Sequence, residues 1–268
     1  MWTIASEQQA HAVQADGLTL PLPRRVALLL SGILVAVFVD LWLGGPLKAL
    51  DVWLSRWTVP EDSVLRGPFG VLDSIGLRGV TVPILIALVL WLRRQTGRWR
   101  PLGVAVVTVL AVNVAIGSMK VLAGRGRPST QSPDLFTGDV LWPSGHAANI
   151  VITGGLIVYL LRTYGHHPIG RWLGMSIVAV PSLLMATVSV ALGYHWLSDL
   201  LAGAIVGLLV VGGVTSWDAS ATRRHHSDIV GRDGPTGGTM SPIDASQARR
   251  RQRRAPRPGG RSAGTTAA

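Results

Sequence analysis

Apolar residues along the chain gather into six long runs. The runs occupy residues 26–43, 79–92, 102–122, 144–161, 173–192 and 197–214. A helix needs roughly 20 apolar residues to cross a bilayer, and inside the hydrocarbon core only helices and closed barrels satisfy every backbone hydrogen bond. The second run is short and the fifth contains Pro181, which a spanning helix tolerates when its neighbours satisfy the freed carbonyl. The pattern predicts an all-α integral membrane bundle of six transmembrane helices.

Arginines mark alternate connections between these runs. They stand before the first run, between the second and third, between the fourth and fifth, and after the sixth: Arg24, Arg25, Arg93, Arg94, Arg98, Arg100, Arg162, Arg171, Arg223 and Arg224. Positively charged loops stay on the cytoplasmic side of a membrane. We therefore predict a multi-pass protein of the cell membrane with both termini cytoplasmic and with the loops after runs one, three and five facing outward.

Composition divides the chain into three parts. Residues 1–23 are polar, and we interpret them as a cytoplasmic segment that precedes a retained membrane helix. A cleaved signal peptide would instead begin with basic residues and become apolar soon after them. Residues 24–215 form the predicted membrane domain. Residues 216–268 are rich in Gly, Pro, Ser and Arg, which predicts a disordered basic tail.

Net charge is +11 and there is no cysteine. In a soluble protein this charge would suggest a nucleic-acid partner. Here the basic residues follow the membrane topology, so we expect no nucleic acid, and the tail could instead contact anionic lipid headgroups. Without cysteine the chain has neither a disulfide framework nor thiolate chemistry.

Ionisable residues at membrane depth are costly and mark functional sites. They gather at the end of the third run, at the start of the fourth and at the start of the sixth. The residues of interest are Lys120, Arg125, Arg127, Ser144, Gly145, His146, His195 and Asp199. The predicted topology brings all three places to the same outward face. The sequence therefore predicts one site at one membrane surface.

Two of these segments favour the binding of phosphate. Lys120 and Arg127 carry cationic donors suited to phosphate oxygens. Ser144 and Gly145 stand where a helix is expected to begin. The free backbone N–H groups and the helix dipole at such a position favour an anion.

The histidines favour phosphoryl transfer. Asp199 follows His195 by four residues, so both can share one helix face. A carboxylate on one imidazole nitrogen leaves the other free as a nucleophile. His146 can then protonate the leaving oxygen. We expect a phosphohistidine mechanism with no metal or other cofactor.

Each residue also has a simpler explanation when it is taken alone. Lys120 could extend its ammonium to the interface, and Ser144 could only cap a helix. His195 and Asp199 could form a structural pair. Two histidines and an aspartate could hold zinc, but the neighbouring Lys and Arg favour an anion site over a cation site.

At these residues the sequence resembles the type 2 phosphatidate phosphatase family of the haloperoxidase-like acid phosphatases. The first family motif is Lys, six residues and Arg-Pro, and Lys120 to Pro128 match it. The second is Pro-Ser-Gly-His, which Pro143 to His146 match. The third is Ser-Arg, five residues, His, three residues and Asp, and His195 and Asp199 match its second half.

The resemblance implies roles for these residues. His195 would be the nucleophile, Asp199 its orienting partner and His146 the acid. Lys120, Arg127, Ser144 and Gly145 would bind phosphate. The sequence departs from the third motif, where Val188 and Ser189 replace Ser-Arg. Loss of a donor from such a cradle slows catalysis on the order of 100-fold or more.

Two explanations fit this departure. Arg125, beside the first motif, could bind the substrate in place of the absent arginine. Alternatively, activity is weak or the substrate differs.

The sequence therefore predicts a membrane lipid-phosphate phosphatase acting on a phosphate monoester or diphosphate of a lipid or polyprenol. Candidate substrates are prenyl phosphates, phosphatidate and phosphatidylglycerophosphate. A catalytically weakened lipid-phosphate binding protein, a phosphotransferase and a phospholipid transporter are the alternatives. The sequence leaves the oligomeric state open.

Overall fold

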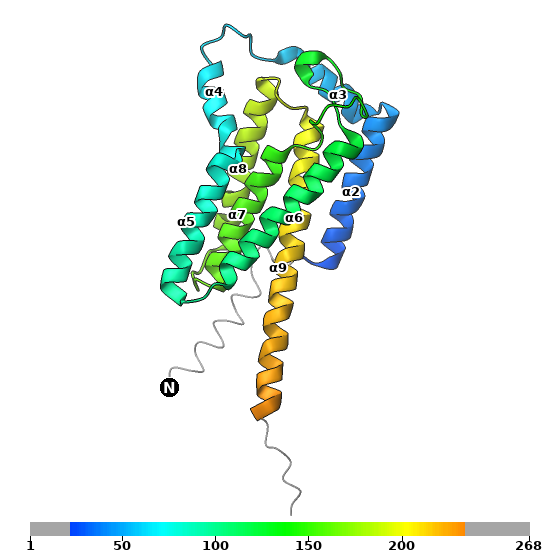
Figure 1. Ribbon diagram of the computed structural model, residues 1–268. Helices are drawn as coiled ribbons and strands as arrows, with labels where there is room; N and C mark the ends of the chain where they lie inside the picture. The colour runs from blue at the N-terminus through cyan, green and yellow to red at the C-terminus, as the bar shows by residue number, and fades with distance from the viewer. Residues whose placement is uncertain (1–21, 234–268) are drawn as a thin grey trace, which may run out of the picture. The chain divides into compact units, whose positions relative to one another are not determined.

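The computed structural model describes residues 22–233, with side chains described through residue 222. Over this part of the chain the fold is helical, with no extended strand, as the sequence predicts (Figure 1). The longer elements are α2 (Arg24–Leu43), α3 (Pro46–Leu54), α4 (Arg66–Asp73), α5 (Arg78–Thr96), α6 (Arg100–Ala123), α7 (Gly145–Thr163), α8 (Arg171–Ala191) and α9 (Leu197–Asp233). Short 3-10 turns follow α3, α4 and α6, namely η1 (Ser55–Trp57), η2 (Ser74–Gly76) and η3 (Pro128–Thr130).

Within residues 22–233, six helices are long and apolar enough to cross a membrane: α2, α5, α6, α7, α8 and the part of α9 to Thr222. They correspond in order to the six apolar runs. The second span is longer than its run, because α5 continues through Arg93 and Arg94 to Thr96. Arginine is a good helix former, and its long side chain can reach the interface from a helix end.

α7 lies at the centre of the bundle, where it packs against α5, α6 and α8. Its spanning window is 67% buried and that of α9 56%, whereas α2 reaches 11%. α2 instead exposes large apolar side chains, among them Leu28 and Leu29. Continuous exposed apolar faces of this kind mark contact with another apolar phase. With the six spans they describe a multi-pass membrane protein.

Asp40, an acidic residue near the end of the first apolar run, has a local structural role. Its carboxylate accepts hydrogen bonds from the backbone N–H groups of Leu47 and Lys48, at 3.3 and 3.0 Å. These N–H groups belong to the first turn of α3, where no intrahelical partner exists. Gly44 makes the tight turn between the helices with φ of 75°. Asp40 thus fixes α3 beside the end of α2.

The last span extends beyond the predicted limit of the membrane domain. α9 continues to Asp233, and residues up to 220 belong to the same compact unit as the other helices. Asp218 is buried and pairs with Arg100 Nε at 2.7 Å. It also accepts hydrogen bonds from the hydroxyls of Tyr159 and Tyr164, at 2.7 and 2.6 Å. The helix therefore continues past the predicted boundary at residue 215, and Asp218, which the sequence places in a polar tail, is buried against the bundle.

The remaining terminal predictions concern residues that the structure does not describe. The N-terminal cytoplasmic segment, predicted for residues 1–23, is outside the described part except for its last two residues. The arginine cluster of the predicted tail also lies outside it.

Candidate active site

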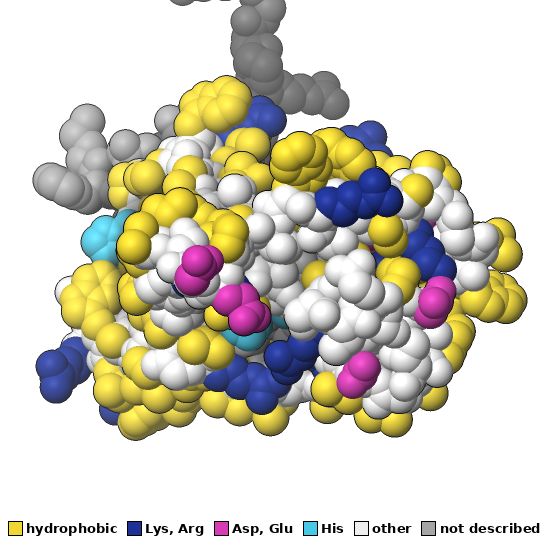
Figure 2. All heavy atoms as spheres, turned by 90° about the horizontal axis from the view of Figure 1, so that it is seen from above, with side chains coloured by type: hydrophobic (Ala, Val, Ile, Leu, Met, Phe, Trp, Pro, Cys, Tyr) yellow, Lys and Arg dark blue, Asp and Glu magenta, His cyan; other side chains and the backbone are white. Residues whose placement is uncertain are grey.

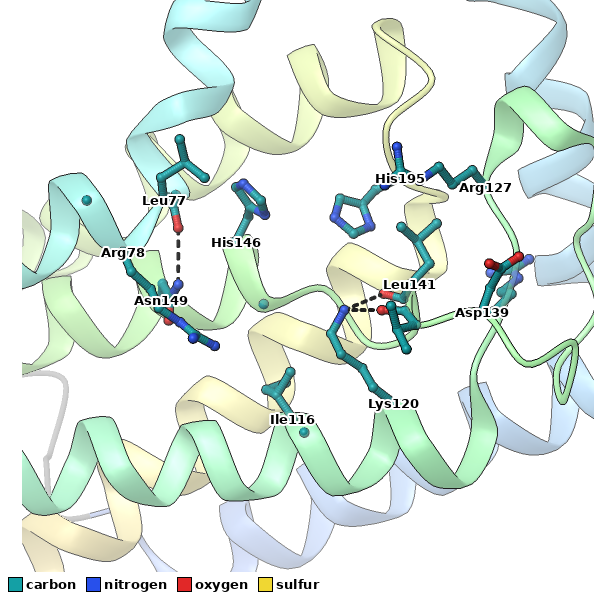
Figure 3. A pocket seen from close by; sticks show the side chains of 16 residues that line it. Leu77, Arg78, Ile116, Lys120, Arg127, Asp139, Leu141, His146, Asn149 and His195 are labelled. Carbon is teal, nitrogen blue, oxygen red and sulfur yellow. Dashed lines mark hydrogen bonds between the residues drawn. The ribbon is translucent and has the colours of Figure 1, made fainter.

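A cavity of about 570 Å³ opens at the end of the bundle where α5, α7 and α9 begin and α6 ends. Figure 2 views the molecule from this end and shows Lys and Arg side chains beside a histidine in a hollow. The predicted residues Lys120, Arg127, Gly145, His146 and His195 line the cavity. Figure 3 shows the two imidazoles on one side of the space and Lys120 reaching up from α6. Segments far apart in sequence therefore meet as the topology predicts.

The two histidines lie next to each other on the cavity lining, in an edge-to-face arrangement. The ring centroids of His146 and His195 lie 5.8 Å apart with an interplanar angle of 63°. His195 Nδ1 lies 3.5 Å from Asp199 Oδ2, which is longer than a well-formed hydrogen bond. The arrangement leaves Nε2 of His195 on the side away from the carboxylate.

The start of α7 presents free backbone donors to the cavity. Ser144 is the N-cap residue, and its hydroxyl accepts the N–H of Ala147 at 3.4 Å. Its carbonyl accepts the N–H of Ala148. The first two N–H groups of the helix, those of Gly145 and His146, therefore remain for an anion.

Ser144 differs from its predicted role. It is fully buried and does not line the cavity. Its own N–H donates to the Asp199 carbonyl at 2.9 Å, which joins the start of α7 to the start of α9. The hydroxyl therefore caps the helix, and the residues of this motif that line the cavity are Gly145 and His146.

Lys120 and Arg127 are placed as cationic walls of the cavity. Lys120 Nζ donates to the carbonyls of Val140 and Leu141. Among residues 22–222 the Arg127 side chain has no hydrogen-bond or ion-pair partner. The loop that carries it is held by Trp196, whose Nε1 donates to the Gly126 carbonyl at 2.8 Å.

Arg125 has a different position from the one predicted for it. One edge reaches the cavity lining, but the side chain is 0% exposed. Nη1 donates to Ser198 Oγ at 2.7 Å and to Asp199 Oδ1 at 2.9 Å. Nε donates to the Pro133 carbonyl at 2.7 Å, and Nη2 donates to Asp51 Oδ2 at 2.9 Å. The sequence predicts Arg125 as a phosphate ligand, whereas in the structure it is a buried partner of Asp199 and Asp51.

Asp51 completes this buried network from α3. Its carboxylate accepts the Ser198 N–H at 3.1 Å and also the Ser198 hydroxyl. Burial raises the pKa of Asp51 above its ordinary value, against the opposing effects of Ser198 and Arg125. The carboxylates of Asp51 and Asp199 thus share one guanidinium beneath His195, which fixes the start of α9.

Sequence reasoning missed three other residues around the cavity. Arg78, the first residue of α5, lines it together with Asn149, and Asn149 Nδ2 donates to the Gly76 carbonyl at 3.2 Å. Asp73 of α4 is buried, and its negative charge acts on His146. The signal available in the sequence was the connection between the first and second apolar runs, which is predicted to face outward. It carries charges of both signs, and such a mixture does not indicate a particular chemistry.

At the α8 position of the missing third-motif arginine, the structure has no cation. Val188 and Ser189 are buried near the end of α8, and the Ser189 hydroxyl lacks a hydrogen-bond partner within residues 22–222. The position of the motif arginine is therefore occupied by a buried, uncharged side chain.

Comparisons with known proteins agree with this geometry. A model of the PAP2 superfamily matches residues 98–223. A crystal structure described as the first transmembrane PAP2 type phosphatidylglycerolphosphate phosphatase, from Bacillus subtilis, superimposes with a TM-score of 0.61 at 18% identity, covering 72% of this chain and 96% of the other. No protein with a curated description matches the chain. The matched residues contain the three motif segments that meet at the cavity, and this part of the chain, residues 98–223, belongs to the PAP2 superfamily.

Proposed function

We propose that this protein is a membrane phosphatase that hydrolyses a phosphate monoester or diphosphate of a lipid or polyprenol through a phosphohistidine. Membership of the superfamily supports a lipid-phosphate phosphatase at the family level. The observation that carries the proposal is the cavity, where His146 and His195 lie next to each other, 5.8 Å apart, beside Lys120 and Arg127. Paired imidazoles next to cationic donors suit a nucleophile and an acid acting on one phosphate.

In the first step, Nε2 of His195 attacks phosphorus and forms a P–N bond while the P–O bond to the leaving group breaks. Asp199 holds the Nδ1 proton and stabilises the cationic ring. Protonated His146 gives its proton to the leaving oxygen. The nonbridging oxygens lie against Lys120, Arg127 and the N–H groups of Gly145 and His146, which stabilise the developing charge.

In the second step, water attacks the phosphohistidine. Neutral His146 accepts a proton from this water, the P–N bond breaks, and phosphate leaves with His195 restored. Each proton given in the first step is recovered in the second, so the cycle consumes only ester and water. No step calls for a metal ion, and we propose that the reaction proceeds with chelator present.

The place of the cavity in the bundle supports an amphiphilic substrate. The cavity lies at the ends of the spans, so the headgroup of a lipid can enter while its chains remain at membrane depth. The similar Bacillus subtilis protein is described as a phosphatidylglycerolphosphate phosphatase, so phosphatidylglycerolphosphate is one substrate to test. The arginine distribution supports a cavity on the outer side and termini in the cytoplasm.

The test measures phosphate release by the purified full-length protein in detergent, with chelator, from phosphatidylglycerolphosphate, phosphatidate and a prenyl diphosphate. We expect release by the wild type and none by His195→Ala. His166→Asn is a matched control, because His166 is an exposed histidine in the connection between α7 and α8.

Each other outcome points to a rival function. Release that depends on an added alcohol acceptor would indicate a phosphotransferase. A wild type as inactive as His195→Ala on every substrate would refute the proposal and favour a lipid-phosphate binding protein.

A further inference from the structure

Arg78 forms the wall of the cavity opposite Arg127. It is the first residue of α5 and lines the cavity with Lys120 and Arg127. Figure 3 shows its side chain running from α5 past Asn149 toward the space in front of the histidines, with Lys120 between it and Arg127. Three cations from three separate segments therefore surround the same volume.

Two of these cations, Arg78 and Arg127, have no ion-pair partner among the described residues. Within residues 22–222 the side chain of Arg78 has no hydrogen bond or ion pair. The Lys120 ammonium is attracted by the carboxylate of Asp199 and repelled by the positive charges of Arg78 and Arg127. The acidic residue on the cavity lining is Asp139, which lies on the far side, next to Arg127 (Figure 3). Repulsion of this kind is relieved when an anion enters.

The location of Arg78 on its helix adds to the excess of positive charge at the cavity. The N-terminus of α5 carries the positive end of the helix dipole, and its first turn contains no acidic residue. A cation in the first turn is unfavourable unless an anion lies nearby. A phosphate in the cavity would interact favourably with both the guanidinium and the helix end.

The α8 side of the cavity offers no such charge. Ser189 stands where the third motif has arginine, and its buried hydroxyl has no partner in the described part of the chain. Arg127, Lys120 and the start of α7 cover the remaining sides. Arg78 is thus the exposed, unpaired arginine available to the histidines from the α5 side.

We propose that Arg78 binds a nonbridging oxygen of the substrate phosphate from α5 and replaces the guanidinium that the third motif lacks. This inference rests on the proposed function, since the bound group is the phosphate that His195 attacks. Arg78 lies on α5, outside residues 98–223, which the family model matches. The guanidinium of Arg78 has the same planar set of N–H donors as the motif arginine, but it would approach the phosphate from α5.

The experiment compares wild type, Arg78→Gln, Arg78→Lys and the control Arg56→Gln in the full-length protein. Arg56 is an exposed arginine of η1 that does not line the cavity. Affinity for inorganic phosphate is measured by thermal stabilisation in detergent, and kcat and KM are measured on a substrate the wild type hydrolyses. We expect Arg78→Gln to lose about tenfold or more in both phosphate affinity and kcat/KM. We expect partial recovery in Arg78→Lys and no change in Arg56→Gln.

The readouts separate this inference from the proposed function. If no substrate is hydrolysed but Arg78→Gln still loses phosphate affinity, Arg78 is a phosphate ligand and the catalytic proposal fails. If hydrolysis occurs and Arg78→Gln equals Arg56→Gln in both assays, the inference is overturned while the proposed function stands. The same assays are repeated in vesicles of anionic lipid. If Arg78→Gln loses activity only in these vesicles and not in detergent, Arg78 contacts bulk lipid headgroups, and the inference is again overturned.

Discussion

Replacing Arg125 by methionine tests the buried network beneath His195. Methionine has a similar length but no charge, so Arg125→Met leaves the carboxylates of Asp51 and Asp199 without their shared guanidinium. Both acids have side chains that are 0% exposed, so water cannot replace the lost partner. Removing one member of a buried ion pair costs about 3–5 kcal/mol, because it strands the opposite charge. We expect Arg125→Met to destabilise the fold by this amount.

Thermal unfolding of the purified protein in detergent measures this loss. For a domain of this size each kcal/mol shifts Tm by about 2–4 °C, which predicts a drop of about 6–20 °C. The drop should shrink as pH is lowered, because a protonated Asp51 needs no counter-ion. Adding Asp51→Asn to Arg125→Met should recover part of the loss, since one stranded carboxylate is then removed.

The opposite pattern would refute this reasoning. If Arg125→Met unfolds at the temperature of the wild type but loses affinity for inorganic phosphate, Arg125 binds the substrate as first predicted. The network with Asp51 and Asp199 would then contribute nothing measurable to stability.

Three further predictions follow from particular contacts. A Cβ at Gly145 would lie 3.9 Å from Ile116 Cγ2, so Gly145→Ala should keep its Tm while the methyl group, beside the free N–H groups of α7, lowers kcat/KM about tenfold or more in the phosphate-release assay. Burial raises the pKa of Asp51 in the folded protein above its ordinary value of 3.8. Protonated Asp51 therefore stabilises the fold below pH 3.8, and this stabilisation is lost as pH rises through the folded pKa. Asp51→Asn should flatten this part of a curve of Tm against pH. Ending the chain after residue 215 removes Asp218 and should lower Tm by several degrees, whereas ending it after residue 233 should not, and equal Tm values would contradict the anchoring role of Asp218.

The spans and the meeting of the motifs could be predicted from the sequence because both depend on local properties. The length of an apolar run decides whether it crosses a bilayer, and the alternation of arginines predicts which ends lie together. Lys120 at the end of α6, His146 at the start of α7 and His195 before α9 therefore had to share one end of the bundle. The four-residue spacing of His195 and Asp199 predicted that the two lie close together, although His195 precedes α9 and does not share a helix face with Asp199.

The partners of individual charged side chains could not be predicted in this way. Asp51 and Ser198 are 147 residues apart in sequence yet share a hydrogen bond, and Arg125 and Asp199 are separated by 74. Two arginines near the first motif look equally free in the sequence, although one is buried against two acids and the other faces the cavity.

The sequence by itself determined the six spans and the two histidines at one membrane face. It also determined that Ser189 stands at the third-motif position where the family has arginine. Only the tertiary structure decided that Arg125 forms buried ion pairs with Asp51 and Asp199. It also decided that Arg78 reaches the same cavity from α5 and that Asp218 anchors α9 beyond residue 215. The physical reason is that helix formation and membrane insertion depend on neighbours along the chain. The state of a buried charge instead depends on which oppositely charged group the packing brings within a few ångströms.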